Sequence, residues 1–371
     1  MKLLRSIFYK LIEVITPILA AFSVGGILIM LVGENPFSIY KIMIEKSLFT
    51  VSGILKTLHL ASPIILTGLA IAITFKANIF NMGVEGGAVL GGFFAGVIGF
   101  SIKGMLSVFH IILCLIVGVL VGILFALIPA ILKAYYKVDE MVVTLMLNYV
   151  VVELVKYLSE GVFRDPSSGY VATYAINKNA MFNKLFGANI TVFFFISLLV
   201  FMVMLIIFKK TKLGFEINAI GKNPEFAEAT GMEVRKKILI TMFISGALSG
   251  LAGAGYLMSE KYRFTLDFSG NPGLGWDGML VSLLGNHNPL GVLTAAIFYA
   301  ALKTGSEYLG IYTNIPKDIV AIIQGLLILF LSTKLVVTKI GISRSKKKNK
   351  FSRALSIESS LGGTCKNESN K

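Results

Sequence analysis

The chain has 371 residues, of which 55% are hydrophobic and only 15% are charged, and it carries a net charge of +15. Its strongly positive mean hydropathy excludes an ordinary water-soluble globular domain. The two cysteines, Cys114 and Cys365, exclude a disulfide framework, and the three histidines lack the spacing of metal ligands.

Apolar segments near the ~20 residues needed to cross a bilayer recur along the whole chain. Ten can be drawn: about 11–32, 58–76, 84–101, 105–132, 140–158, 190–208, 238–258, 275–286, 289–309 and 316–338. The first is too long for the core of a signal peptide, so it is interpreted as an uncleaved span. The sequence therefore predicts an all-α polytopic membrane protein with about 10 transmembrane segments.

Lysine and arginine crowd into short flanks of these segments, above all in residues 209–237 and in the tail. The positive-inside rule explains this distribution better than nucleic-acid binding does. It predicts a cell-membrane protein with both termini in the cytoplasm. The expected parts are a cytoplasmic N-terminus at 1–10, a transmembrane domain at 11–338 and a basic, disordered tail at 339–371.

Two apolar segments are too short to span a bilayer, and both begin with the same kind of phrase. "NMGVEGGAVLGG" at 81–92 and "GLGWDGMLVSLLG" at 273–285 share glycine, any residue, an acid and glycine. Short, broken helices at corresponding places in two halves indicate a translocation path. They predict an inverted repeat of residues 58–158 against 238–338.

Polar and aromatic side chains in or beside these helices are candidates for the path. They are Asn81, Glu85, Asn148, Trp276 and Asp277. Both acids would lie in a first helical turn, where a carboxylate meets the positive end of the helix dipole. For each acid, simple helix capping and substrate contact both stay open. Asn148 could instead bond a neighbouring helix, and Trp276 could lie at the membrane interface.

Other polar residues have simpler interpretations. Asn81, the pair Asn271 and Pro272, and the pair Asn288 and Pro289 are expected to cap helices. Lys303 and Glu307 lie four residues apart, which predicts a surface ion pair. Small residues such as Gly118, Gly122, Gly246 and Gly250 are expected only to allow close helix packing.

The cytoplasmic loop at 209–237 is too long for a turn. "NPEFAEATG" at 223–231 offers a capping Asn223, Pro224 at the first helical position and a stop at Gly231. A short helix here could lie on lipid or dock into a partner. The chain has no phosphate-binding loop, so a partner would have to bind any ATP that drives it.

Three stretches resemble the permease subunits of ABC importers for nucleosides and simple sugars, a family related to the ribose and branched-chain amino-acid permeases. They are "SPIILTGLAIAITFKANIFNMGVEGG" at 62–87, "LGFEINAIGKNPEFAEATGM" at 213–232 and "GWDGMLVSLLGNHNPLGVLTAAIFYAALKTG" at 275–305. The resemblance covers about residues 12–338. It departs from the family at Gly87, where glutamine is usual, and at Glu228, where the family tends to have two adjacent alanines.

This resemblance implies a second permease subunit, homologous or identical, a cytoplasmic ABC ATPase and an extracytoplasmic substrate-binding lipoprotein. It implies that ATP and Mg²⁺ bind the ATPase and that this chain holds no cofactor of its own. It also implies that the 209–237 loop is the coupling loop. Asn223, Pro224, Ala227 and Gly231 are the positions that match the family's coupling motif.

The sequence therefore predicts an importer permease for nucleosides or simple sugars and not an enzyme. The main alternative is an ion-coupled secondary transporter of a small polar solute, in which Glu85 and Asp277 would carry protons. An intramembrane enzyme is disfavoured because no cluster of catalytic residue types falls at one depth.

Overall fold

A computed structural model gives the fold and describes residues 2–185, 190–265 and 272–312, with short pieces at 321–323, 325–326 and 329. The chain divides into two compact units. One comprises Gly26–Val320, and the other comprises Met1–Gly25 with Ala321–Lys371. The predicted basic tail at 339–371 lies outside the described residues.

Helices account for almost all regular structure in the described residues. In chain order they are α1 (Lys2–Leu31), α2 (Pro36–Leu48), α3 (Val51–Lys76), α4 (Val84–Ser101), α5 (Ser107–Tyr136), α6 (Glu140–Glu160), the 3-10 turn η1 (Lys178–Ala180), α7 (Val192–Lys210), α8 (Lys212–Lys222), α9 (Pro224–Ala229), α10 (Val234–Tyr256), the π turn η2 (Leu257–Lys261), α12 (Leu274–Leu284) and α13 (Pro289–Tyr312). Strands β1 (Lys184–Leu185) and β2 (Ile190–Thr191) form an antiparallel pair that the all-α prediction missed.

Six described helices are long and apolar enough to cross a membrane, or seven if the broken pair Ile18–Leu31 and Pro36–Leu48 counts as one span. The six are α3, α4, α5, α6, α7 and α10 with its π turn. A polytopic helical membrane protein is thus confirmed, but ten spans are not. The predicted segment 316–338 falls largely outside the described residues. The prediction that two segments are too short to span was wrong for α4, which has 18 residues and is long enough to cross a membrane, whereas α12 has 11 and is not.

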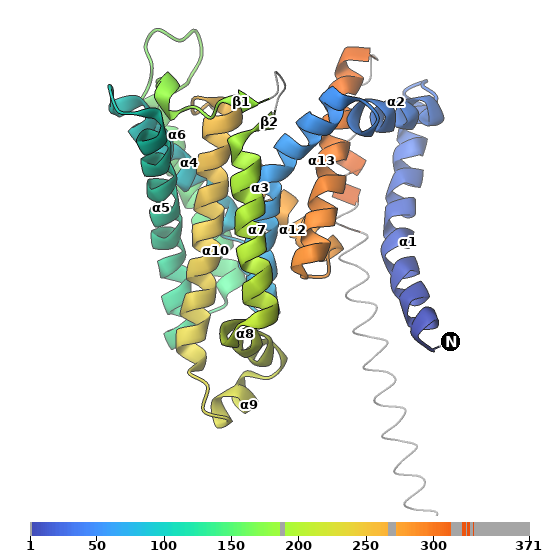
Figure 1. The fold of residues 1–371 in the computed structure, drawn as a ribbon, viewed down its shortest axis with the longest axis vertical. Coiled ribbons are helices and arrows are strands. Elements are labelled where there is room, and N and C mark those ends of the chain that lie inside the picture. The colour runs from blue at the N-terminus through green and yellow to red at the C-terminus, as the bar shows by residue number, and fades with distance from the viewer. Residues whose placement is uncertain are drawn as a thin grey trace, which may run out of the picture. The chain divides into compact units, whose positions relative to one another are not determined.

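Within Gly26–Val320, helix α3 lies at the centre of the packing (Figure 1). Helices α7, α10, α12 and α13 pack against it. Of the apolar 18-residue stretch of α3 that could cross a membrane, 89% is buried inside the protein. Helix α10 also crosses α5 at close range. A Cβ atom on Gly250 would collide with the backbone carbonyl of Gly118, so the expected close packing through small residues is confirmed.

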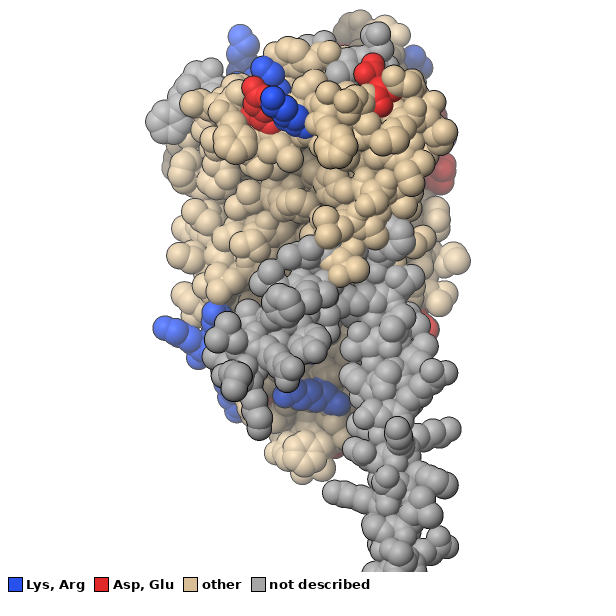
Figure 2. Space-filling view, turned by 90° about the vertical axis from the view of Figure 1, so that its right-hand side faces the viewer, with Lys and Arg blue, Asp and Glu red and all other residues tan. Residues whose placement is uncertain are grey.

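Outward-facing helices present apolar side chains. The apolar 18-residue stretches of α5, α6 and α7 are only 28%, 22% and 22% buried inside the protein. Their exposed residues include Leu120, Met146 and Leu199. On the face drawn in Figure 2, described Lys, Arg, Asp and Glu side chains gather toward the two ends, and the belt between them is uncharged. This distribution suits a hydrocarbon environment around the middle of the helices.

The expected coupling loop is more structured than the sequence indicated. Two helices, α8 and α9, lie beyond the ends of α7 and α10 (Figure 1), where one was predicted. The side chain of Thr211 caps α8 by accepting a hydrogen bond from the Gly214 amide. Similarly, α3 begins seven residues before the predicted 58, because Thr50 caps it by accepting from the Gly53 amide.

Candidate functional site

The site is built around a stretch of backbone that is buried but not helical. Helix α3 ends at Lys76, Asn78 adopts a left-handed conformation at φ 58°, and α4 begins only at Val84. In between, Ile79, Asn81, Met82 and Gly83 are buried. Non-helical backbone inside a membrane protein requires hydrogen-bond partners from neighbouring segments, since lipid offers none. We call residues 77–83 the connector.

Helix α6 supplies those partners from one face. The Glu140 carboxylate accepts from the Phe80 amide at 2.9 Å, and the Thr144 hydroxyl accepts from the Met82 amide at 3.1 Å. Glu140 and Thr144 are four residues apart, so they lie one above the other on the helix. Sequence reasoning missed both residues, although their spacing with Asn148 was visible.

Asn148 is the third member of this face. Its carboxamide oxygen accepts from the Gly86 amide at 3.0 Å, and its nitrogen donates to the Met82 carbonyl at 2.8 Å. The side chain therefore bridges the connector and the first turn of α4. Of the two alternatives left open for Asn148, the bond to a neighbouring segment is present, and a role in the path is not tested.

Asn81 does not cap α4 in the expected way. The N-cap residue is Gly83, which makes no side-chain capping bond. Instead, the Asn81 carboxamide accepts from the Gly83 amide at 2.9 Å and donates to the Ser245 hydroxyl of α10 at 3.0 Å. Asn81 thus shapes the turn before the helix and ties it to α10. The prediction was wrong by two positions, because the chain becomes helical only after Gly83.

Glu85 lies in the first turn of α4, as predicted, but its carboxylate stabilises a different helix. It accepts hydrogen bonds from the backbone amides of Gly273, at 2.9 Å, and of Gly275. These amides belong to the beginning of α12. The Glu85 side chain is 2% exposed, so the two short helices share one buried carboxylate at their positive ends.

Glycine is required where the two short helices meet. A Cβ atom on Gly275 would lie 2.5 Å from the backbone nitrogen of Glu85, and Gly273 has φ +77°. Gly87, on the next turn, faces Ser249 so closely that a side chain would collide with its hydroxyl. This contact gives a physical reason for glycine at 87. The expected cap Asn271 lies outside the described residues.

Asp277 in the first turn of α12 is bound by α13. The Tyr299 hydroxyl donates to one carboxylate oxygen, and the Lys303 ammonium lies 3.0 Å from the other. The predicted pair of Lys303 with Glu307 is therefore wrong. Glu307, one turn further along α13, instead pairs with Lys56 of α3. Lys303 and Glu307 therefore each pair with a residue of another helix and not with each other.

A third pair of polar side chains lies near the end of α10. His59 of α3 lies 3.0 Å from the carboxylate of Glu260, which the π turn η2 places against α3. π-type turns occur often at functional sites. Together the three pairs form a polar seam across α3, η2, α12 and α13. This seam could not be predicted from local patterns, because its members come from four separate segments.

One predicted path residue, Trp276, faces outward, as does Phe80 of the connector. The side chain of Trp276 is 39% exposed and that of Phe80 is 42% exposed, whereas Asn81, Glu85, Asn148 and Asp277 are buried and hydrogen-bonded. Phe80 also packs against Phe75, with ring centroids 5.1 Å apart. The junction where α4 and α12 meet therefore has hydrogen-bonded polar side chains inside and two aromatic side chains outside.

Helix α9 has the ends that the sequence predicted. The Asn223 side chain accepts from the Phe226 amide at 3.0 Å, Pro224 occupies the first turn, and Gly231 has φ +85°. Ala227 is fully buried, while Phe226 is 66% exposed. The predicted capping is confirmed. Phe226, and not Ala227, is therefore the large apolar side chain that α9 exposes.

We predict that Asn148→Leu will destabilise the protein, because the Gly86 amide and the Met82 carbonyl would lose their partner. Each unsatisfied buried group costs about 1–3 kcal/mol. Thermal unfolding of the purified protein in detergent measures the effect. Tyr149→Leu is the matched control, since the adjacent Tyr149 is 69% exposed. Equal unfolding temperatures for the two variants would contradict the bridging role of Asn148.

A membrane protein with two short helices that meet at a buried carboxylate has the architecture of a transporter. The chain matches the family described as "Branched-chain amino acid transport system / permease component" over residues 53–332. It belongs to this family, and it is the permease subunit of an ABC importer, not an enzyme. The ion-coupled alternative is therefore not supported.

Several characterised relatives are similar over most of their length. The chain is 30% identical to the nucleoside ABC transporter permease protein NupB of Lactococcus lactis subsp. cremoris, over 88% of this chain and 92% of NupB. It is 30% identical to the guanosine ABC transporter permease protein NupP of Bacillus subtilis, over 91% and 98%. It is 28% identical to the glucose ABC transporter permease protein TsgB13 of Haloferax volcanii, over 85% of each. No solved structure matches the chain significantly.

Proposed function

We propose that this permease carries neutral nucleosides, with simple sugars as the second candidate class. The observation that carries the proposal is the junction of α4 and α12 at Glu85, beside which Trp276 and Phe80 stand exposed. An exposed aromatic face suits a flat base. The names of NupB and NupP support nucleosides, and the name of TsgB13 supports a sugar.

The internal pairing of the acids favours a neutral cargo. Asp277 is already paired with Lys303, and both oxygens of Glu85 accept backbone amides. A cation or an anion entering here would meet no unpaired charge from these residues. We therefore propose that Trp276 contacts cargo directly. Asn81, Glu85, Asn148 and Asp277 would fix the shape of the path around it.

The proposed function requires further subunits besides this chain. A second permease subunit would complete the path, and a lipoprotein outside would deliver cargo. NupC and NupQ, permease proteins from the same two organisms as NupB and NupP, also match this chain at 22% and 25% identity. These paired matches favour a homologous, non-identical second subunit.

The ATPase would dock on helices α8 and α9, and its ATP and Mg²⁺ would drive the change of access. Asn223, Pro224, Ala227 and Gly231 would give α9 its shape, and Phe226 would make the contact. This arrangement places the 209–237 loop and both termini in the cytoplasm. We further propose the ten-span, inverted-repeat topology, which the meeting of the two short helices supports.

Reconstitution tests this function. Proteoliposomes containing the permease pair, the ATPase and the binding lipoprotein should take up radiolabelled guanosine when ATP is present. An uncoupler should leave uptake unchanged. Phe226→Ala should lower the amount of ATPase that co-purifies and slow uptake, whereas Phe109→Ala, at a similarly exposed position near the beginning of α5, is the matched control.

Two outcomes would contradict the proposal. Uptake that continues without ATP and collapses with an uncoupler would favour an ion-coupled transporter. A lipoprotein that bound only branched-chain amino acids, and neither nucleosides nor sugars, would overturn the proposed cargo while leaving the permease assignment intact.

A further inference from the structure

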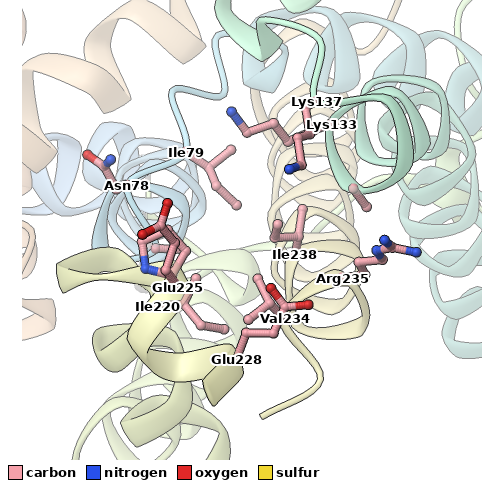
Figure 3. A pocket seen from close by; sticks show the side chains of 13 residues that line it. Asn78, Ile79, Lys133, Lys137, Ile220, Glu225, Glu228, Val234, Arg235 and Ile238 are labelled. Carbon is pink, nitrogen blue, oxygen red and sulfur yellow. The ribbon is translucent and has the colours of Figure 1, made fainter. Parts of the chain in front are cut away.

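A cavity of about 420 Å³ lies where the expected coupling helices meet the ends of the bundle (Figure 3). Its walls come from the connector, the end of α5, helices α8 and α9, and the beginning of α10. Its volume falls within the range of small-molecule sites, about 300–1,000 Å³. With the proposed topology, the cavity opens on the cytoplasmic side.

One wall of the cavity is formed by helices that are anchored to the bundle, and the opposite wall is formed by α9. Helix α8 is held against α10 by the pair of Glu216 with Lys237, at 2.7 Å. Gly221 at its end packs directly on the Lys76 carbonyl of α3, where a side chain would collide. Helix α9, just beyond this anchor, forms the opposite wall through Glu225 and Glu228. A molecule in the cavity would therefore touch the anchored helices and α9 together.

The two sides differ in charge. Lys133 and Lys137 reach into the space from α5, and Glu225 and Glu228 face it from α9 (Figure 3). Lys137, Glu225 and Glu228 make no ion pair within the described part of the chain. Arg235 of α10 and Asn78 of the connector also line the cavity, and Ile79, Ile220, Val234 and Ile238 supply apolar wall. A ligand with an anionic group, an apolar middle and hydrogen-bond donors would match these walls.

The cavity is also linked to the connector. The Lys133 ammonium lies 2.6 Å from one carboxylate oxygen of Glu140, and the other oxygen of Glu140 accepts from the Phe80 amide. An anion bound at Lys133 would compete with Glu140 for the same ammonium. Occupancy would thus act on α9 and on the connector at once.

We propose that this cavity binds a small phosphorylated solute. The phosphate would lie at Lys133 and Lys137, and hydroxyl or amino groups of the solute would donate to Glu225 and Glu228. Phosphate suits lysine because the ammonium acts as a compact point charge with three donors. Phosphorylation inside the cell is the class of reaction that would convert an imported nucleoside or sugar into such a ligand.

Calorimetric binding to the assembled transporter in nanodiscs tests the site, with the ATPase sites saturated by a non-hydrolysable ATP analogue. The probes are ribose 5-phosphate, GMP, inorganic phosphate and unphosphorylated guanosine. Ribose 5-phosphate or GMP should bind saturably, and Lys137→Ala should weaken binding about tenfold or more. Lys137→Arg should retain most of the affinity. The matched control is Lys210→Ala, an exposed lysine at the end of α7 that does not line the cavity.

The site is overturned if no phosphorylated probe binds at about 10 mM, as expected if an ATPase side chain fills the cavity. It is also overturned if Lys137→Ala and wild-type transporters bind equally, because binding would then lie elsewhere. Inorganic phosphate binding as tightly as ribose 5-phosphate would overturn the role of Glu225 and Glu228. The assay measures no transport, so its failure is distinguishable from failure of the proposed cargo.

Discussion

Replacing Glu85 with alanine is expected to lower the stability of the protein more than any other single change at the junction. The amide of Gly275, which is buried, and the amide of Gly273, which is partly buried, would both lose their acceptor. At about 1–3 kcal/mol for each unsatisfied group, the total cost is about 2–6 kcal/mol. Thermal unfolding in detergent measures stability, and uptake in proteoliposomes measures function.

Glu85→Gln separates the charge of the side chain from its shape. The amide oxygen can still accept one backbone amide, but the amide nitrogen would face the other donor. We expect a loss of about 1–3 kcal/mol and slower transport. Glu233→Ala is the control, since the side chain of Glu233 is 71% exposed and pairs only weakly with Lys236 at 3.5 Å. If Glu85→Ala unfolded at the wild-type temperature, its carboxylate would not hold α12.

The second large effect is expected at the pair of Asp277 with Lys303. Removing the ammonium in Lys303→Met leaves the Asp277 carboxylate, whose side chain is only 12% exposed, with the Tyr299 hydroxyl as its remaining partner. Breaking a buried pair costs about 3–5 kcal/mol, and the partial exposure of Lys303 reduces this to about 2 kcal/mol. Neutralising both residues in Asp277→Asn with Lys303→Met should restore part of the loss.

A double-mutant cycle on unfolding temperature isolates this coupling. The matched cycle uses Glu233 and Lys236, an exposed pair three residues apart on the surface, for which we expect at most about 0.5 kcal/mol. Transport by the double variant is the second readout. Strict additivity at Asp277 and Lys303 would mean that their contact in the structure carries no stabilising energy.

The sequence predicted the class of protein and the ends of several helices, and it did so for local reasons. Apolar length and the distribution of lysines depend only on composition along the chain. Likewise, the cap at Asn223 and the stop at Gly231 depend on residues within one turn of each other. Helix α8 was missed although its 11 residues are amphipathic, with a face of buried residues that packs on α3, α7 and α10.

The partners of the polar side chains could not be predicted. Glu85 was correctly placed in a first helical turn, yet the amides that it binds are nearly two hundred residues further along the chain. Lys303 was paired with its own helix because local spacing offered Glu307, whereas tertiary packing brought it to Asp277. Glu140 and Thr144 were passed over because their task, satisfying the connector, exists only once α6 packs beside it.

By itself, the sequence determined that this chain is a polytopic membrane protein with two short, glycine-flanked helices that each begin near an acid. Those features follow from local hydropathy, from glycine's lack of a side chain and from the helix dipole. Only the tertiary structure decided that one carboxylate serves the second helix, that α6 supports the connector and that Lys303 neutralises Asp277. In a buried, water-poor interior each polar group must find a partner, and packing selects that partner from segments that the sequence keeps far apart.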